Sequence, residues 1–115
     1  MRQPAVIAAG LAVALGACTT GTASLTDAQL ATQIRAAFAD VGCKMMGATA
    51  QEAEAPFEAA LAKRLNVPVA QVNNRDGDIF KRGDKIVGEM MRTGEIKLSN
   101  TGFNATVMNC TPTPQ

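Results

Sequence analysis

The clearest hydrophobic pattern in the chain begins after residue 24. Apolar side chains recur there at the spacing of one face of an amphipathic helix, at Leu30, Ile34, Phe38 and Val41. Thr26 and Gln29 have the spacing of a capping box, which satisfies free backbone N–H groups at a helix start. Gly42 belongs to the residue type that most often ends helices. The pattern predicts a helix over 26–41.

A second helical pattern follows a polar connection. Its apolar side chains repeat every four residues, at Phe57, Leu61 and Leu65. Pro56 favours a helix start, because a proline in the first turn loses no hydrogen bond, so the predicted helix covers 56–65. Thr49 and Glu52 have the spacing of another capping box inside the connection. Pro68 prevents the helix from continuing.

The sequence predicts two further helices between residues 68 and 92. A short one covers 68–72 and is interrupted by the turn formers NNRDGD. The other runs from Asp84, as its N-cap, to Arg92, just before Gly94. The side chains that we expect this helix to bury are Ile86, Val87, Met90 and Met91.

Two alternating segments, EIKLS and FNATVMN, then predict a β-hairpin. Its inward residues are expected to be Ile96, Leu98, Phe103, Ala105 and Val107. Residues 111–115, TPTPQ, are expected to form a disordered tail. The expected fold is one small domain over 25–110, mainly α with a C-terminal β-hairpin. This α+β order of three to four helices and a hairpin resembles the winged-helix scaffold.

The first eighteen residues, MRQPAVIAAGLAVALGAC, have the pattern of a secretory signal. Arg2 precedes an apolar run that is shorter than the ~20 residues of a membrane-spanning helix but suits the apolar region of a signal peptide. The last four residues, LGAC, resemble the lipobox of bacterial lipoproteins. This resemblance implies that 1–17 are removed and that Cys18 is diacylated on sulfur. Thr19 after the cysteine implies sorting to the outer membrane.

On the lipoprotein interpretation, 18–24 are the lipidated cysteine and a polar tether. Two other interpretations remain open. The apolar run can form a buried N-terminal helix, although Gly10 and Gly16 would weaken it. Ordinary signal cleavage after Ala17 would leave Cys18 as a free thiol.

Charge and composition argue against a nucleic-acid partner. After residue 17 the chain has ten basic and ten acidic side chains, and it contains no histidine. Residues 60–72, ALAKRLNVPVAQV, resemble a helix-turn-helix element, but Arg75 stands where that pattern requires an apolar residue, and Asp76 and Asp78 follow. Such a surface has little attraction for phosphates. If the signal interpretation is wrong, a cytoplasmic helix-turn-helix DNA-binding regulator is the alternative.

Two patterns point toward a metal site, and both are incomplete. NNRDGD resembles a calcium loop, but Val72 and Gly83 occupy its first and last ligand positions. Methionine thioethers are ligands for Cu(I), and the chain after the signal has them at Met45, Met46, Met90, Met91 and Met108. Without a histidine or a Met-x-Met run, these are better explained as adaptable core side chains. We expect no metal and no cofactor, with a periplasmic ligand or copper carrier as the alternative.

Catalytic chemistry has few candidates in this chain. Ser24 and Ser99 are its two serines, and no histidine can serve as their base. Glu52, Glu54 and Glu58 cluster near a helix start, where acids complement the helix dipole. A glycine-rich phosphate loop is also missing. We therefore predict no catalytic residues and no enzymatic activity.

Cys43 and Cys110 are the two cysteines left in the exported domain if the sulfur of Cys18 carries lipid. In an oxidising compartment such a pair indicates a disulfide, and their separation indicates a structural bond rather than a redox pair, which would normally be Cys-x-x-Cys. Two free thiols are the alternative. The expected function is that of a non-catalytic envelope lipoprotein facing the periplasm, which binds an unknown envelope protein or serves as an accessory subunit.

Overall fold

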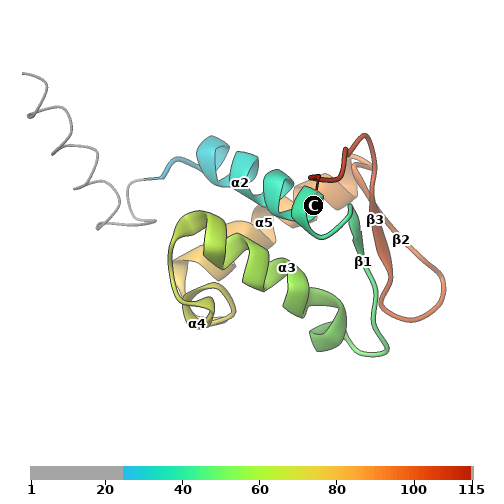
Figure 1. The fold of residues 1–115 in the computed structure, drawn as a ribbon, viewed down its shortest axis with the longest axis horizontal. Coiled ribbons are helices and arrows are strands. Elements are labelled where there is room, and N and C mark those ends of the chain that lie inside the picture. Colours follow the sequence, from blue (N-terminus) through green and yellow to red (C-terminus); the bar gives the residue numbers. More distant parts are fainter. Residues whose placement is uncertain (1–24, 115) are drawn as a thin grey trace, which may run out of the picture.

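The computed structural model describes residues 25–114 (Figure 1). Within this part, four helices are followed by a hairpin, and one short strand lies between the first two helices. The helices are α2 (Asp27–Asp40), α3 (Ala50–Leu65), α4 (Val69–Val72) and α5 (Asp78–Arg92). The strands are β1 (Lys44–Met45), β2 (Ile96–Leu98) and β3 (Ala105–Val107). The predicted fold class, mainly helical with a C-terminal hairpin, is confirmed.

The first helix, α2, begins and ends where its local signals placed it. Thr26 Oγ1 accepts a hydrogen bond from the N–H of Gln29 at 3.0 Å, and Gln29 Oε1 accepts one from the N–H of Thr26 at 2.8 Å. Both halves of the predicted capping box are therefore present. At the other end Gly42 has a φ of +83°, a left-handed conformation that glycine adopts at no steric cost. The chain then turns into β1.

The second long helix, α3, begins six residues before the predicted start at Pro56, so that boundary was wrong. Thr49 Oγ1 accepts from the N–H of Glu52 at 3.1 Å, and the Glu52 carboxylate accepts from the N–H of Ala48 at 3.0 Å. These caps stabilise a first turn ahead of the proline. Pro56 therefore lies inside the helix, where its ring removes one N–H donor without ending the helix.

The start of α5 also differs from the prediction. The helix begins at Asp78, with Gly77 as N-cap, and Asp84 lies in its interior. The turn formers close within a few residues, because the N–H of Gly77 donates to the carbonyl of Asn74 at 2.9 Å. Asp78 stands in the first turn, where a carboxylate complements the helix dipole, and Ile79 is buried in the core.

The three strands form an antiparallel sheet in the order β1-β3-β2. The pairs are Lys44–Thr106 and Met45–Ala105 on one side of β3, and Ile96–Val107, Lys97–Thr106 and Leu98–Ala105 on the other. The sequence did not predict β1. Two residues carry no periodicity of their own, and they become a strand only through pairing with β3. The added strand extends the predicted hairpin to a three-stranded antiparallel sheet.

The inward face of the hairpin is only partly as predicted. Ile96, Ala105 and Val107 are buried, whereas Leu98 is 66% exposed and Phe103 is 53% exposed. The alternation of apolar residues is correct, but the hairpin reaches beyond the helices that cover its other end (Figure 1). Leu98 and Phe103 lie in that uncovered part, so the prediction that they point into the core was wrong.

The core is centred on α2, which packs against α3 and α5. Its largest fully buried side chains are Phe38, Leu30, Ile34 and Met90. The ring of Phe38 stacks on that of Phe57 with 4.3 Å between centroids. Every buried side chain within 25–114 is hydrophobic. No helix in this range combines the length and the apolar character that crossing a bilayer requires.

Candidate functional site

The predicted lipidation site, Cys18, lies outside the described residues, as do the rest of the signal and the tether. The described chain begins at Leu25, directly before α2. The predicted tether, residues 18–24, would therefore join the domain at the first turn of α2.

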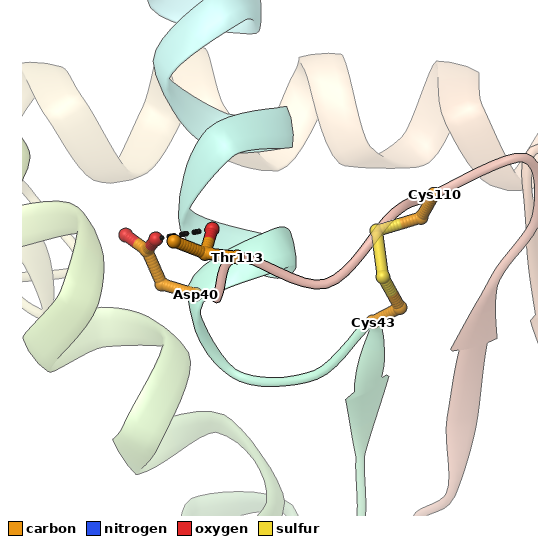
Figure 2. Close-up of a disulfide and its surroundings, with 4 residues drawn as sticks. All are labelled: Asp40, Cys43, Cys110 and Thr113. Carbon is orange, nitrogen blue, oxygen red and sulfur yellow. Dashed lines mark hydrogen bonds between the residues drawn. A yellow bond between two sulfur atoms is a disulfide. The ribbon is translucent and has the colours of Figure 1, made fainter. Parts of the chain in front are cut away.

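The two remaining cysteines are brought together as predicted. Cys43 follows α2 and Cys110 follows β3, and their Cα atoms lie 5.9 Å apart in a disulfide (Figure 2). This distance is within the range that disulfides occupy, roughly 4.4–6.8 Å. The bond joins the end of the first helix to the end of the last strand, which are 67 residues apart in the sequence.

The residues after Cys110 pack against α2, in contrast to the disordered tail that we expected. The N–H of Thr113 donates to the carbonyl of Ala39 at 2.9 Å, and Thr113 Oγ1 donates to Asp40 Oδ1 at 2.8 Å (Figure 2). Asp40 also accepts two hydrogen bonds from Arg64 of α3, the shorter at 2.6 Å. Arg64 first and Thr113 second lower the pKa of the Asp40 carboxyl. The disulfide holds the segment after Cys110 beside its hydrogen-bond partners in α2. The amino-acid composition of the segment gives no sign of these partners.

A pocket of about 110 Å³ opens between α2, α3 and α5. Most of its lining is apolar, and it includes the stacked rings of Phe38 and Phe57. The apolar lining consists of Ile34, Phe38, Met45, Phe57, Leu61, Val72, Ile79, Phe80, Gly83 and Val87. Five elements contribute to it, which is why no single motif in the sequence pointed to this site.

Three carboxylates complete the lining of the pocket: Glu54 and Glu58 from α3, and Asp84 from α5. We had explained Glu54 and Glu58 as acids at a helix start. Since α3 begins at Ala50, that explanation holds for Glu52, which is in the first turn, and fails for the other two. Burial first, and the nearby Glu54 second, raise the pKa of Glu58, while the charge of Arg75 opposes this shift.

A second candidate surface lies at the far end of the sheet. Met46, Leu98 and Phe103 expose 65%, 66% and 53% of their surface there, and we call them the hairpin surface. The N–H of Phe103 donates to the carbonyl of Gly47 at 3.4 Å, which brings the hairpin tip beside the residue that follows Met46. Three large apolar side chains are therefore exposed at this end of the sheet.

Two exposed lysines lie in line across the sheet next to the hairpin surface. Lys44 of β1 and Lys97 of β2 both pair with Thr106 of β3, and all three are exposed. Residues paired across neighbouring strands point to the same face. One face of the sheet is therefore basic and polar, close to the apolar hairpin surface.

The methionines do not all behave as core side chains. Met90 is buried and Met45 packs against the core, as expected. Met46, Met91 and Met108 are exposed, so their assignment to the core was wrong. Within residues 25–114 there is no group of three or more His, Cys, Asp or Glu side chains that could hold a metal ion.

The helix-turn-helix-like stretch, 60–72, forms the end of α3, a left-handed turn at Asn66 with φ +58°, and α4. The helix directly before the hairpin is α5, rather than α4. The exposed charges of α5 are of both signs: Lys81, Lys85 and Arg92 are basic, and Asp78, Asp84 and Glu89 are acidic. No excess of positive charge marks this helix for phosphate contact.

Comparisons with protein-family models, with curated proteins and with solved structures found no match for this chain. The candidate functions therefore rest on the residues themselves, above all on the pocket and the hairpin surface.

Proposed function

We propose that this protein is a lipid-anchored, non-catalytic envelope protein that binds another envelope protein through its hairpin surface. The anchor is the lipidated Cys18, on the outer membrane and facing the periplasm. The observation that carries the binding role is the shared exposure of Met46, Leu98 and Phe103 at one end of the sheet.

Exposed apolar residues are ordinary when they are scattered singly, but several large ones at the same end of a small sheet favour an interaction site. Aromatic residues and methionine are enriched at the centres of protein interfaces, where desolvated anchors carry most of the binding energy. Phe103 and Met46 belong to these types. Lys44 and Lys97 on the neighbouring face favour a partner that carries acidic groups around an apolar centre.

The position of the hairpin surface supports this role. The start of α2, where the tether joins, and the hairpin tip lie at opposite ends of the domain (Figure 1). A lipid on Cys18 would hold the α2 end at the membrane. The hairpin surface would then face away from that membrane and be open to a partner.

Crosslinking followed by affinity capture from intact envelopes tests the proposal. Phe103→Asp and Leu98→Asp place charge in the hairpin surface and should remove the crosslinked partner. Val69→Asp is the matched control, because Val69 is also an exposed apolar residue, 45% exposed, but lies on α4 away from the hairpin. If all three variants capture the same partner as the parent chain, the hairpin surface is not the binding site.

We also propose that the protein has no nucleic-acid partner. The charge balance after residue 17 and the mixed charges of α5 support this, because counterion release requires a surplus of cations. In a gel-shift titration at roughly 150 mM salt, near physiological ionic strength, the protein should not retard duplex DNA. A sequence-specific shift that survives at that salt concentration would contradict the proposal.

A further inference from the structure

We propose that the pocket between α2, α3 and α5 binds a small organic cation: an ammonium group on a short alkyl or aromatic body. This inference does not depend on the hairpin surface or on its protein partner. It rests on the size of the pocket, on its apolar lining and on the sign of the charges beside it.

The apolar lining suits the body of such a ligand. At about 110 Å³ the pocket is of the same order as the roughly 150 Å³ engineered apolar cavity that binds benzene. Part of this space exists because residue 83 is glycine. A Cβ at Gly83 would meet only the Cδ1 of Ile34, at 3.8 Å, so a larger side chain there would enter the pocket.

The charges beside the pocket suit the ammonium group. Of the ten side-chain carboxylates of Asp and Glu, all within the described residues, five form ion pairs with arginine: Asp27, Asp40, Asp78, Glu89 and Glu95. Three of the other five are Glu54, Glu58 and Asp84, and all three line this pocket. They come from both helical walls, α3 and α5, so a cation between the walls would meet carboxylates on either side.

The carboxylates beside the pocket also favour a cation over the anionic and neutral ligands that an apolar pocket could hold. An anion would be repelled by the three carboxylates. A neutral ligand would take water from Glu58 without replacing the lost hydration, which is unfavourable for a charged group. Arg75 lies over the ring of Phe80, 5.6 Å from its centroid, and its charge weakens the acidic field at Glu58 only in part. An ammonium ligand offsets the desolvation and gains contact with aromatic faces.

Three probes that share a benzene ring test the selectivity: benzylammonium, benzyl alcohol and benzoate. We would titrate each into the full-length protein in nanodiscs, subtract the signal of empty nanodiscs, and follow the side-chain methyl NMR signals of Ile34, Val72, Ile79 and Val87. Benzylammonium should shift these methyls saturably and bind at least about tenfold more tightly than benzyl alcohol, the effect of one charge-assisted contact. Benzoate should not bind. Equal affinity for the ammonium and the alcohol would overturn the proposal.

Variants locate the site. Gly83→Leu fills the pocket and should abolish binding, whereas Gly88→Leu, the same change in α5 where a new Cβ meets nothing within 4 Å, should leave it intact. Glu58→Gln should reduce the preference for ammonium over alcohol several-fold. Asp76→Asn removes a carboxylate that neither lines the pocket nor forms an ion pair, and should leave that preference unchanged. If Gly83→Leu unfolds the protein, comparing Glu58→Gln with Asp76→Asn still tests the proposed site. Equal effects of those two would overturn the proposed site.

Discussion

Asp40 connects three segments of the fold that are distant in the sequence. Asp40 is the last residue of α2. Its carboxylate accepts two hydrogen bonds from Arg64 of α3 and a third from Thr113 near the C-terminus. The two hydrogen bonds from Arg64 make its pair with Asp40 bidentate, the form in which an arginine–carboxylate pair is most specific. The Asp40 side chain is 25% exposed and that of Arg64 is 35% exposed, so solvent screens the pair only in part.

Asp40→Asn should therefore destabilise the domain and free the segment after Cys110. Arg64 and Thr113 lower the folded-state pKa of Asp40 below its unfolded value. The stabilisation is thus present above the unfolded pKa and is lost as pH falls through the folded pKa. Urea denaturation of parent and variant should show a difference at pH 7 that shrinks below about pH 4. A difference independent of pH would mean that the ion pair contributes nothing.

Among the helices and strands, the features predicted most accurately from the sequence are those that neighbouring residues determine. The capping box at Thr26, the stop at Gly42 and the left-handed turn at Asn66 depend on neighbouring residues, and all three are present. Pro56 and Asp84 are both common at helix starts but lie inside α3 and α5, so the predicted starts were wrong; α3 is capped upstream by Thr49, whereas α5 begins after Gly77 without a side-chain cap. The strand β1 was missed because it depends on a partner 60 residues away.

The candidate sites could not be predicted in the same way. Alternation placed Leu98 on the side of Ala105, with which it pairs, but Leu98 and Phe103 are both exposed because burial depends on where the helices end. The pocket needs five elements at once, and Glu58 was explained by a helix start that lies elsewhere. The cysteines were the exception, because the small number of cysteines left one pairing once Cys18 was assigned to lipid.

Pro56→Ala tests the account of α3. Alanine restores the N–H that proline lacks, and in an exposed helix interior a proline is less favourable than alanine by about 3 kcal/mol. Pro56 is exposed and lies inside the helix. The variant should therefore be more stable, by at most that amount, in urea denaturation and thermal melting. A loss of stability would show instead that Pro56 supports the fold.

In the molecule as a whole, the disulfide and the segment after it hold the C-terminal end of the domain against α2. The bond links α2 to β3 and holds residues 111–114 against α2. Closing a loop of 67 residues stabilises a domain by about 4 kcal/mol in the chain-entropy model. For a small domain with a total stability of roughly 5–15 kcal/mol, this is a large fraction.

Cys43→Ser and Cys110→Ser should therefore lower the melting temperature by similar amounts, and the double variant should be no less stable than either single variant. Each substitution removes the same bond, so the effects are not additive. Thiol counting on denatured, unreduced protein from the envelope is the direct check of the bond itself. Two titratable thiols at Cys43 and Cys110 would show that it does not form in the cell.

We propose that the domain is held at a membrane by its α2 end and presents its hairpin surface away from that membrane. That claim depends on Cys18. Acyl chains contribute about 0.8 kcal/mol per buried methylene, and two chains give stable anchoring where one is marginal. Mass spectrometry of the N-terminal peptide of the native protein is the most direct test. We expect Cys18 to be the first residue and to carry a diacylglyceryl group on sulfur. An unmodified Cys18, with or without residues 1–17 attached, would contradict it.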